Sequence, residues 1–90
     1  MYKVLIIGAG AQGGACASIL SKRKNISNIL LTDVDLDLAQ KTIDKIGSDK
    51  IFAAKIDAAD GVQIEKVARD IDIIFNFVLI RYNTTIWKLP

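Results

Sequence analysis

The chain has 90 residues, of which 51% are hydrophobic and 24% are charged. This length allows one globular domain, and the composition is typical of a folded chain rather than a disordered one. The net charge of +2, without basic residues interleaved with aromatic ones, argues against a nucleic-acid-binding surface. No apolar run approaches the roughly 20 residues that span a membrane.

Short apolar runs alternate with segments of helical periodicity along the chain. The apolar runs, rich in β-branched residues, predict buried parallel strands at residues 3–7, 29–32, 51–56 and 73–79. Helices are predicted at residues 11–23, between Asp35 and Gly47, after Asp60, and from near Thr84 to Pro90. Their expected buried faces are Cys16, Ile19 and Leu20, then Leu36, Ala39, Ile43 and Ile46, then Ile64, Val67, Ala68 and Ile71.

Boundary residues support these predictions. Asp35 is placed to cap the second helix, and Gly47 stands where a terminal glycine is expected. Asp60 and Gln63 resemble a capping box, and residues 25–28 predict a polar turn. The order β-α-β-α-β-α-β with short connections predicts an α/β fold, the first half of a doubly wound parallel sheet with right-handed crossovers.

A glycine pattern joins the first strand to the first helix. Gly8-Ala-Gly10-Ala-Gln-Gly13 matches G-x-G-x-x-G, and in a β-α-β unit of about 30 residues this indicates a Rossmann-type dinucleotide-binding loop. Gly8 permits a tight turn, Gly10 lets a diphosphate approach the backbone, and Gly13 lets the helix pack closely on the strand. The anion would meet the N–H groups of Ala11 and Gln12. Alternatively, the glycines serve only as a turn.

Asp33 ends the second strand, where a carboxylate can accept hydrogen bonds from the adenine ribose. Its charge would repel a 2′-phosphate, and Val34 and Asp35 follow it rather than an arginine. The sequence therefore favours NAD, with NADP as the alternative. The structural alternative is that Asp33 caps the next helix and Asp35 is exposed.

Two further polar residues are candidates for the same site. Asp57 follows the third strand and is placed to reach the adenine edge, or else is a loop or helix-entry residue. Asn76 is the one strongly polar residue inside the last apolar run, so its amide needs hydrogen-bond partners. Because the carboxyl ends of the strands border the cofactor crevice, we expect Asn76 to face the dinucleotide.

The chain contains no histidine, and its only cysteine is Cys16. The sequence therefore indicates neither a metal site nor a catalytic residue within this chain. Cys16 is expected to be a small core residue, not a nucleophile. With no disulfide possible within the chain and no signal peptide in the sequence, a cytoplasmic location is expected.

Four segments together resemble the N-terminal NAD(P)-binding domain of the saccharopine dehydrogenase family. They are residues 3–13, Thr32-Asp-Val-Asp35, Ile56-Asp-Ala-Ala-Asp60, and residues 73–83, where an apolar strand with an inner asparagine leads into Arg81-Tyr82-Asn83. The resemblance covers essentially residues 1–90 but only the front part of the family's length. One departure is Leu79-Ile80, where family members often carry a proline.

The resemblance implies an oxidoreductase that acts on CH–NH bonds, with most of the substrate site in a following domain. Carried onto this chain, it places the phosphates at Gly8, Gly10 and Gly13, and the ribose at Asp33. It likewise places the adenine at Asp57 and Ala58, and the nicotinamide side near Asn76. This chain by itself is not expected to be catalytically competent.

Two alternatives remain from other functional classes. One is a nucleotide-sensing regulatory domain of the kind that gates potassium uptake, and the other is an inactive remnant that keeps the fold. The ending Arg81-Tyr82-Asn83 favours the dehydrogenase interpretation. If the fourth strand lies at the edge of the sheet, Phe75 and Phe77 would be exposed there. We then expect self-association through this strand, since unpaired edges invite pairing with a second chain.

Overall fold

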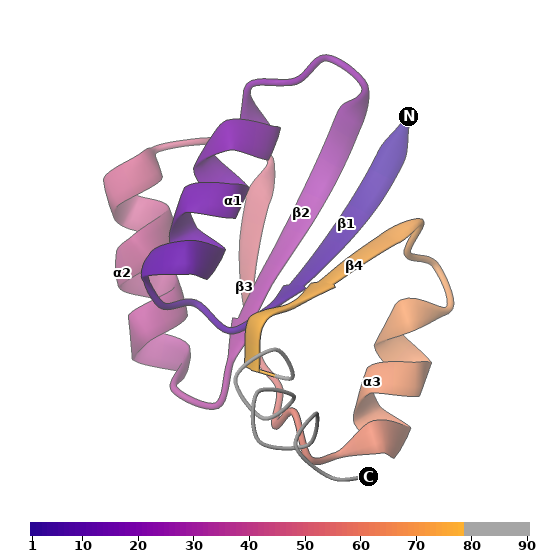
Figure 1. Cartoon of the computed structure of the whole chain (residues 1–90). Helices are drawn as coiled ribbons and strands as arrows, with labels where there is room; N and C mark the ends of the chain where they lie inside the picture. The colour runs from indigo at the N-terminus through magenta and orange to yellow at the C-terminus, as the bar shows by residue number, and fades with distance from the viewer. Residues whose placement is uncertain (79–90) are drawn as a thin grey trace, which may run out of the picture.

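The computed structural model describes residues 1–78 as alternating strands and helices. The elements are β1 (Tyr2–Ile7), α1 (Ala11–Ser21), β2 (Ile26–Asp33), α2 (Leu36–Ile46), β3 (Ile51–Lys55), α3 (Gly61–Ala68) and β4 (Ile73–Asn76). The strands pair in parallel in the order β3-β2-β1-β4. Figure 1 shows α1 and α2 on one face of this sheet and α3 on the other. The predicted doubly wound α/β fold is therefore confirmed.

The strand order places the chain's reversal point beside β1. The sheet grows from β1 through β2 to β3 on one side, and the chain then returns to add β4 on the other side. In doubly wound sheets, ligands bind in the crevice at the carboxyl ends of the strands that flank this reversal. Here those ends are the ends of β1 and β4.

β1 is the centre of both core layers. Val4 and Ile6 contribute to the layer beneath α1 and α2, whereas Leu5 and Ile7 contribute to the layer beneath α3. Each of the four side chains is at most 1% exposed. Burial on both faces explains why β1 reads as a continuous apolar run instead of an alternating one.

β2 begins at Ile26, so the predicted polar turn at 25–28 is wrong for residues 26–28, and only Asn25 of that segment lies in a turn. The Tyr2 N–H donates to the Asn25 carbonyl at 2.7 Å, and Ile26 then pairs with Tyr2. Ile26 is only 2% exposed. The polar residues Ser27 and Asn28 concealed the strand, because their local preference is overridden by the pairing partner that β1 supplies.

α1 packs through a different face from the predicted one. Its buried residues are Gly13, Ala17 and Ser21, while Ile19 is 61% exposed. Cys16 and Leu20 pack at the margin of the core as predicted, but the prediction for Ile19 is wrong. α1 is apolar around most of its circumference, so periodicity does not identify the buried face. The smallest side chains face the sheet because they let the helix approach it closely.

The ends of α2 form as predicted. The Asp35 carboxylate accepts from the Leu38 N–H at 3.2 Å, and Gly47 closes the helix with φ +71°, in the left-handed region that favours glycine. Ala39 and Ile43 are buried. Leu36, expected on the same face, is 45% exposed because it lies in the first turn.

α3 is capped by Asp60, whose carboxylate accepts from the Gln63 N–H at 3.0 Å. The reciprocal half of the predicted capping box is absent from this turn. The Gln63 side-chain amide donates to the Lys55 carbonyl, and the Asp60 N–H donates to the Asp57 carbonyl. Ile64, Val67 and Ile71 pack against the core layer on this face, as predicted.

β4 is shorter than predicted, because Phe77 and Val78 have helical backbone conformation instead of continuing the strand. At its start, two hydrogen bonds join it to β1: the Lys3 N–H donates to the Asp72 carboxylate at 2.8 Å, and the Asp72 N–H donates to the Lys3 carbonyl at 2.9 Å. The predicted roles of Leu79, the Arg81-Tyr82-Asn83 ending and the last helix lie outside the described residues. Within residues 1–78, no helix is long and apolar enough to cross a membrane.

Candidate functional site

The glycine loop leaves β1 at the carboxyl edge of the sheet and leads directly into α1. Gly8 has φ +105°, in the left-handed region that L-residues rarely adopt. A Cβ on Gly8 would also lie 3.2 Å from Val78 Cγ2 and 3.4 Å from Phe77 Cβ. The tight turn predicted at Gly8 is thus present, and the segment that follows β4 packs against it.

Gly13 and Gly10 differ in what the fold requires of them. A Cβ on Gly13 would overlap the Gly8 carbonyl oxygen, so only glycine allows α1 to lie this close to the loop. Gly10 has φ −69° in an extended conformation that any residue can adopt. Among the described residues nothing lies within 4 Å of the position that its Cβ would occupy. A turn alone explains Gly8 and Gly13 but gives no reason for a glycine at position 10.

The N-terminus of α1 has no side-chain cap. Gly10 occupies the N-cap position, and no side chain accepts a hydrogen bond from the first turn. The first N–H groups of any α-helix lack partners within the helix, and the helix dipole places partial positive charge there. Ala11 and Gln12 are exposed at this end. The arrangement can accept an anion through backbone N–H groups.

Asp33 lies at the end of β2 beside the glycine loop. One carboxylate oxygen accepts from the Ala9 N–H at 2.8 Å, and the other accepts from the Asp35 N–H at 2.9 Å. The helix cap itself is Asp35, so the alternative in which Asp33 caps α2 is wrong. A carboxylate offers about four lone-pair sites, and half-buried Asp33 therefore keeps acceptor capacity for a ligand.

The bond between Asp33 and Ala9 was not foreseen from the sequence. Ala9 is 1% exposed, and its carbonyl lies 3.3 Å from the Thr42 hydroxyl of α2. The Leu38 carbonyl lies 2.9 Å from the same hydroxyl, so the two carbonyls share its one proton in a three-centre hydrogen bond. The one sequence signal for these contacts is an alanine between two loop glycines, because its methyl group takes little space.

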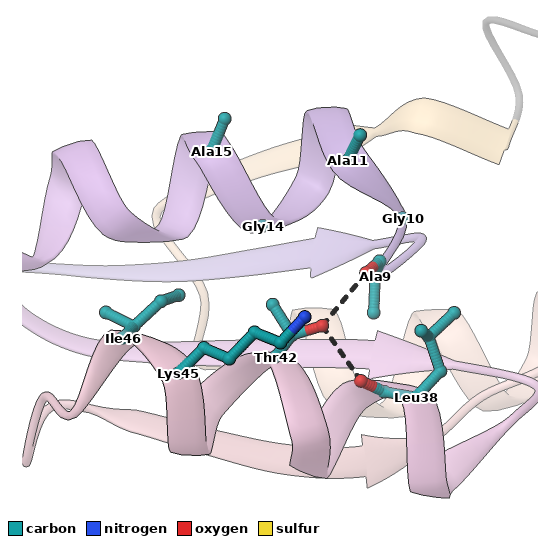
Figure 2. A pocket seen from close by; sticks show the side chains of 9 residues that line it. All are labelled: Ala9, Gly10, Ala11, Gly14, Ala15, Leu38, Thr42, Lys45 and Ile46. Carbon is teal, nitrogen blue, oxygen red and sulfur yellow. Dashed lines mark hydrogen bonds between the residues drawn. The ribbon is translucent and has the colours of Figure 1, made fainter.

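A cavity of about 330 Å³ lies between α1 and α2 beside the loop. Figure 2 shows its lining, with Thr42 at the centre bonded to Ala9 and Leu38 and with the Lys45 side chain along one wall. Backbone and small side chains from Ala9 to Ala15 form the opposite wall. The cavity thus reaches the start of α1.

Asp57 and Ala58 follow β3, next to the end of β2. The Ile56 N–H donates to the Asp33 carbonyl at 3.1 Å, which holds the two strand ends together. The Asp57 carboxylate accepts from the Ala59 N–H at 2.9 Å, so this exposed residue forms a local turn. Ala58 packs against the core layer beneath α3. The loop role predicted for Asp57 is present.

Asn76 is the last residue of β4 and pairs with Ile7, the last residue of β1. It is half-buried and has an interaction partner in the structure. Its position at the reversal point of the sheet, next to the residue that precedes Gly8, is the one expected from the sequence. The strand ends therefore bring Gly8, Asp33 and Asn76 to one edge of the sheet.

Cys16 has the environment of a core residue. It packs against the core layer beneath α1, and burial raises the pKa of its thiol above the usual value. A raised pKa leaves less thiolate at neutral pH, which agrees with the prediction that Cys16 is a core residue and not a nucleophile.

Known proteins share this arrangement. The family model described as saccharopine dehydrogenase NADP binding domain matches residues 4–89. The apo histidine-tagged saccharopine dehydrogenase (L-Glu forming) from Saccharomyces cerevisiae has a TM-score of 0.72 and 25% sequence identity, over 86% of this chain and 16% of that chain. Quinate dehydrogenase from Corynebacterium glutamicum in complex with NAD has a TM-score of 0.69 and 28% identity, over 84% of this chain and 26% of that chain. Both neighbours are dehydrogenases, and neither supports the sensing-domain alternative.

Proposed function

The chain belongs to the saccharopine dehydrogenase family, whose NADP-binding domain model matches residues 4–89, and from this premise we propose how it binds an adenine dinucleotide. The diphosphate lies at the start of α1, against the N–H groups of Ala11 and Gln12. The adenine ribose donates hydrogen bonds to Asp33. These assignments follow the order of the strand ends along one edge of the sheet.

The observation that carries this proposal is Gly10. Its backbone conformation suits any residue, and no described atom approaches its missing Cβ within 4 Å. A glycine that the fold does not require is explained if a ligand needs the space beside the backbone. The uncapped first turn of α1 is the adjacent source of donors for that ligand.

Isothermal titration calorimetry of the folded chain with NAD, NADH, NADP and NADPH tests the proposal. We expect saturable binding of at least one dinucleotide and a rise in melting temperature with ligand concentration, because a ligand that binds only the native state stabilises it. Absence of both heat and thermal shift at millimolar ligand would overturn the assignment.

The preferred cofactor is NAD. Asp33 is followed by Asp35 at the N-cap and by Asp37 in the first turn of α2, so the segment after β2 carries further negative charge. Like charges at short range oppose binding of a 2′-phosphate. Lys55 pairs with Asp33 between β2 and β3. Because this basic residue can offset part of the negative charge, we expect NADP to bind as well, but more weakly than NAD.

Asp33→Asn tests this preference. Loss of the charge should raise the affinity for NADP and lower that for NAD, so the NAD to NADP ratio of Kd values should change by about tenfold, equivalent to about 1.4 kcal/mol. Asp44→Asn is the matched control, since it removes an exposed carboxylate nearer the end of α2 that has no part in the proposed site. An unchanged ratio in Asp33→Asn would contradict the role given to Asp33.

The remaining cofactor contacts follow the strand ends outward. Asp57 and Ala58 border the adenine, since they follow β3 next to Asp33. Asn76 borders the nicotinamide half, since it ends β4 on the opposite side of the loop. In nuclear magnetic resonance titrations, AMP should perturb amides near Asp57, while full NAD should in addition perturb those near Asn76.

We place the whole chain, residues 1–90, in a longer oxidoreductase as its dinucleotide-binding domain. The chain spans 16% and 26% of the length of the two dehydrogenase structures it matches. The longer protein would transfer a hydride between the dinucleotide and a CH–NH bond. A substrate domain joined to this chain should produce turnover that the 90-residue chain does not show.

Self-association through β4 is a second proposal. β4 is an outer strand of the described sheet, paired on one side with β1, and Ile74 is 47% exposed on it. Phe75 and Phe77 are half-buried and stack with ring centroids 6.4 Å apart, so they are less exposed than the sequence suggests. A second copy would pair along Ile73–Phe75, on the side of β4 away from β1. Sedimentation that shows only monomer at high concentration would contradict it.

A cytoplasmic location is also proposed. Cys16, the sole cysteine of the chain, is a reduced thiol packed against the core, which fits a reducing compartment. Cell fractionation with an antibody against the chain tests this directly.

A further inference from the structure

We propose that Thr42 is a positioning residue for the diphosphate loop, an inference that rests on the function proposed above. Thr42 is in the second turn of α2, outside the glycine pattern of the loop. Its hydroxyl is 3.3 Å from the Ala9 carbonyl and 2.9 Å from the Leu38 carbonyl. Through the first contact, α2 holds one peptide group of the loop.

That peptide group joins Ala9 to Gly10. A trans peptide is planar, and its C=O and N–H point in opposite directions. The structure has no cis peptide among its described residues. Because the Ala9 carbonyl points toward Thr42 on α2, the Gly10 N–H points away from α2. The hydroxyl therefore sets the direction of a backbone donor at the point where the loop enters α1.

The neighbouring peptide group is held from the other side. The Ala9 N–H donates to Asp33 at 2.8 Å, so both polar groups of Ala9 are bonded to side chains that belong to β2 and α2. Ala9 itself is 1% exposed. Asp33 and Thr42 together fix the loop before a ligand arrives.

Close packing supports the role of Thr42. A Cβ on Gly14 would lie 2.9 Å from Thr42 Cγ2, so α1 and α2 are in close contact at this pair. The methyl group of Thr42 packs on α1 while its hydroxyl reaches the loop (Figure 2). Packing and hydrogen bonding can therefore be separated by substitution at this one position.

The test compares Thr42→Val, which keeps the shape and removes the hydroxyl, with Thr42→Ser, which keeps the hydroxyl and removes the methyl group. Thr42→Val should weaken ADP and NADH binding about two- to tenfold, the range for one hydrogen bond. Adenosine, which lacks a diphosphate, should bind both variants as it binds the wild type. Gln40→Ala, which removes an exposed hydrogen bond to Asp44 on the same helix, is the control.

A second readout needs no ligand. The amide resonances of Gly10 and Ala11 should shift in Thr42→Val and remain near the wild-type positions in Thr42→Ser and Gln40→Ala. The proposal is overturned if wild type and Thr42→Val bind ADP and NADH equally, or if these amides do not move. If the wild type binds no dinucleotide, the proposed function fails, and the amide shifts alone decide whether Thr42 orients the loop.

Discussion

The N-terminus of α1 and the N-termini of α2 and α3 are built differently. Asp35 caps α2 and Asp60 caps α3, and each carboxylate accepts a hydrogen bond from the backbone N–H three residues further along the chain. α1 begins at Gly10 with no side-chain cap and no acidic residue in its first turn. In α2 and α3 an aspartate side chain accepts a hydrogen bond from an N–H group of the first turn, whereas in α1 the N-cap residue has no side chain to do so. The missing cap therefore marks the start of α1 as the candidate anion site.

The same contrast appears within the glycine loop. Gly13 faces the loop backbone, where a side chain would collide with the Gly8 carbonyl, and Gly10 faces space. Gly13 is required by the packing of α1 on the loop, whereas Gly10 leaves space in which a ligand can lie. Substitutions at the two positions test whether stability depends on Gly13 and ligand binding on Gly10.

Gly13→Ala should have the largest effect. Its Cβ would overlap a backbone oxygen that cannot move without displacing the loop. We expect a loss of about 3 kcal/mol in the free energy of unfolding, at the upper end of overpacking costs. Urea denaturation followed by circular dichroism measures this loss. A wild-type midpoint would show that α1 can shift away from β1 at little cost.

Gly10→Val should affect binding more than stability. The branched side chain would occupy the space beside the diphosphate, so we expect at least about a tenfold rise in the Kd for NADH, or about 1.4 kcal/mol. Because valine is a poorer N-cap than glycine, the free energy of unfolding should fall by about 1 kcal/mol or less, well below the loss expected for Gly13→Ala. If Gly10→Val unfolds the chain while NADH binding by the remaining native fraction is unchanged, the division of roles between Gly10 and Gly13 is wrong.

Asp60→Ala should cost about 1 kcal/mol of stability, because it removes an aspartate N-cap. Asp60 lies at the start of α3, on the face of the sheet opposite α1. NADH affinity, measured at a temperature where the variant is fully folded, should therefore equal that of the wild type. A binding defect in this variant would mean that the caps of α3 and the site are coupled.

Gly10→Ser should have the smallest effect on stability, and it is informative because stability should rise while NADH affinity falls. Serine can cap α1, which should raise the free energy of unfolding by a few tenths of a kcal/mol. The same hydroxyl would compete with the diphosphate for the first-turn N–H groups. Melting temperature and NADH affinity should therefore change in opposite directions. Parallel changes would argue that the uncapped end of α1 is not the anion site.

Sequence reasoning succeeded where one local interaction decides the structure. The caps at Asp35 and Asp60, the left-handed Gly47 and the turn at Gly8 each follow from the chemistry of one residue. The alternation of elements then determined the sheet, because parallel strands need crossover helices.

Sequence reasoning failed where a distant partner decides. Ile26 joins β2 only because Tyr2 is beside it, and Ile19 is exposed because the smallest residues of α1 face the sheet. In the candidate site, the glycines and Asp33 were identified from spacing, but the bonds from Asp33 and Thr42 to Ala9 were not. Those bonds link residues 24 and 33 positions apart and carry no local pattern.

The pairing of β1 with β4 has a consequence for synthesis on the ribosome. Lys3 and Asp72 are bonded across 69 positions of sequence, and every residue of β4 pairs with β1. Val4–Ile7 therefore emerges early yet keeps one open flank until the last described strand has been translated. Contacts of such separation form slowly, so this strand, buried on both faces in the folded domain, stays incompletely paired from its own synthesis until that of β4.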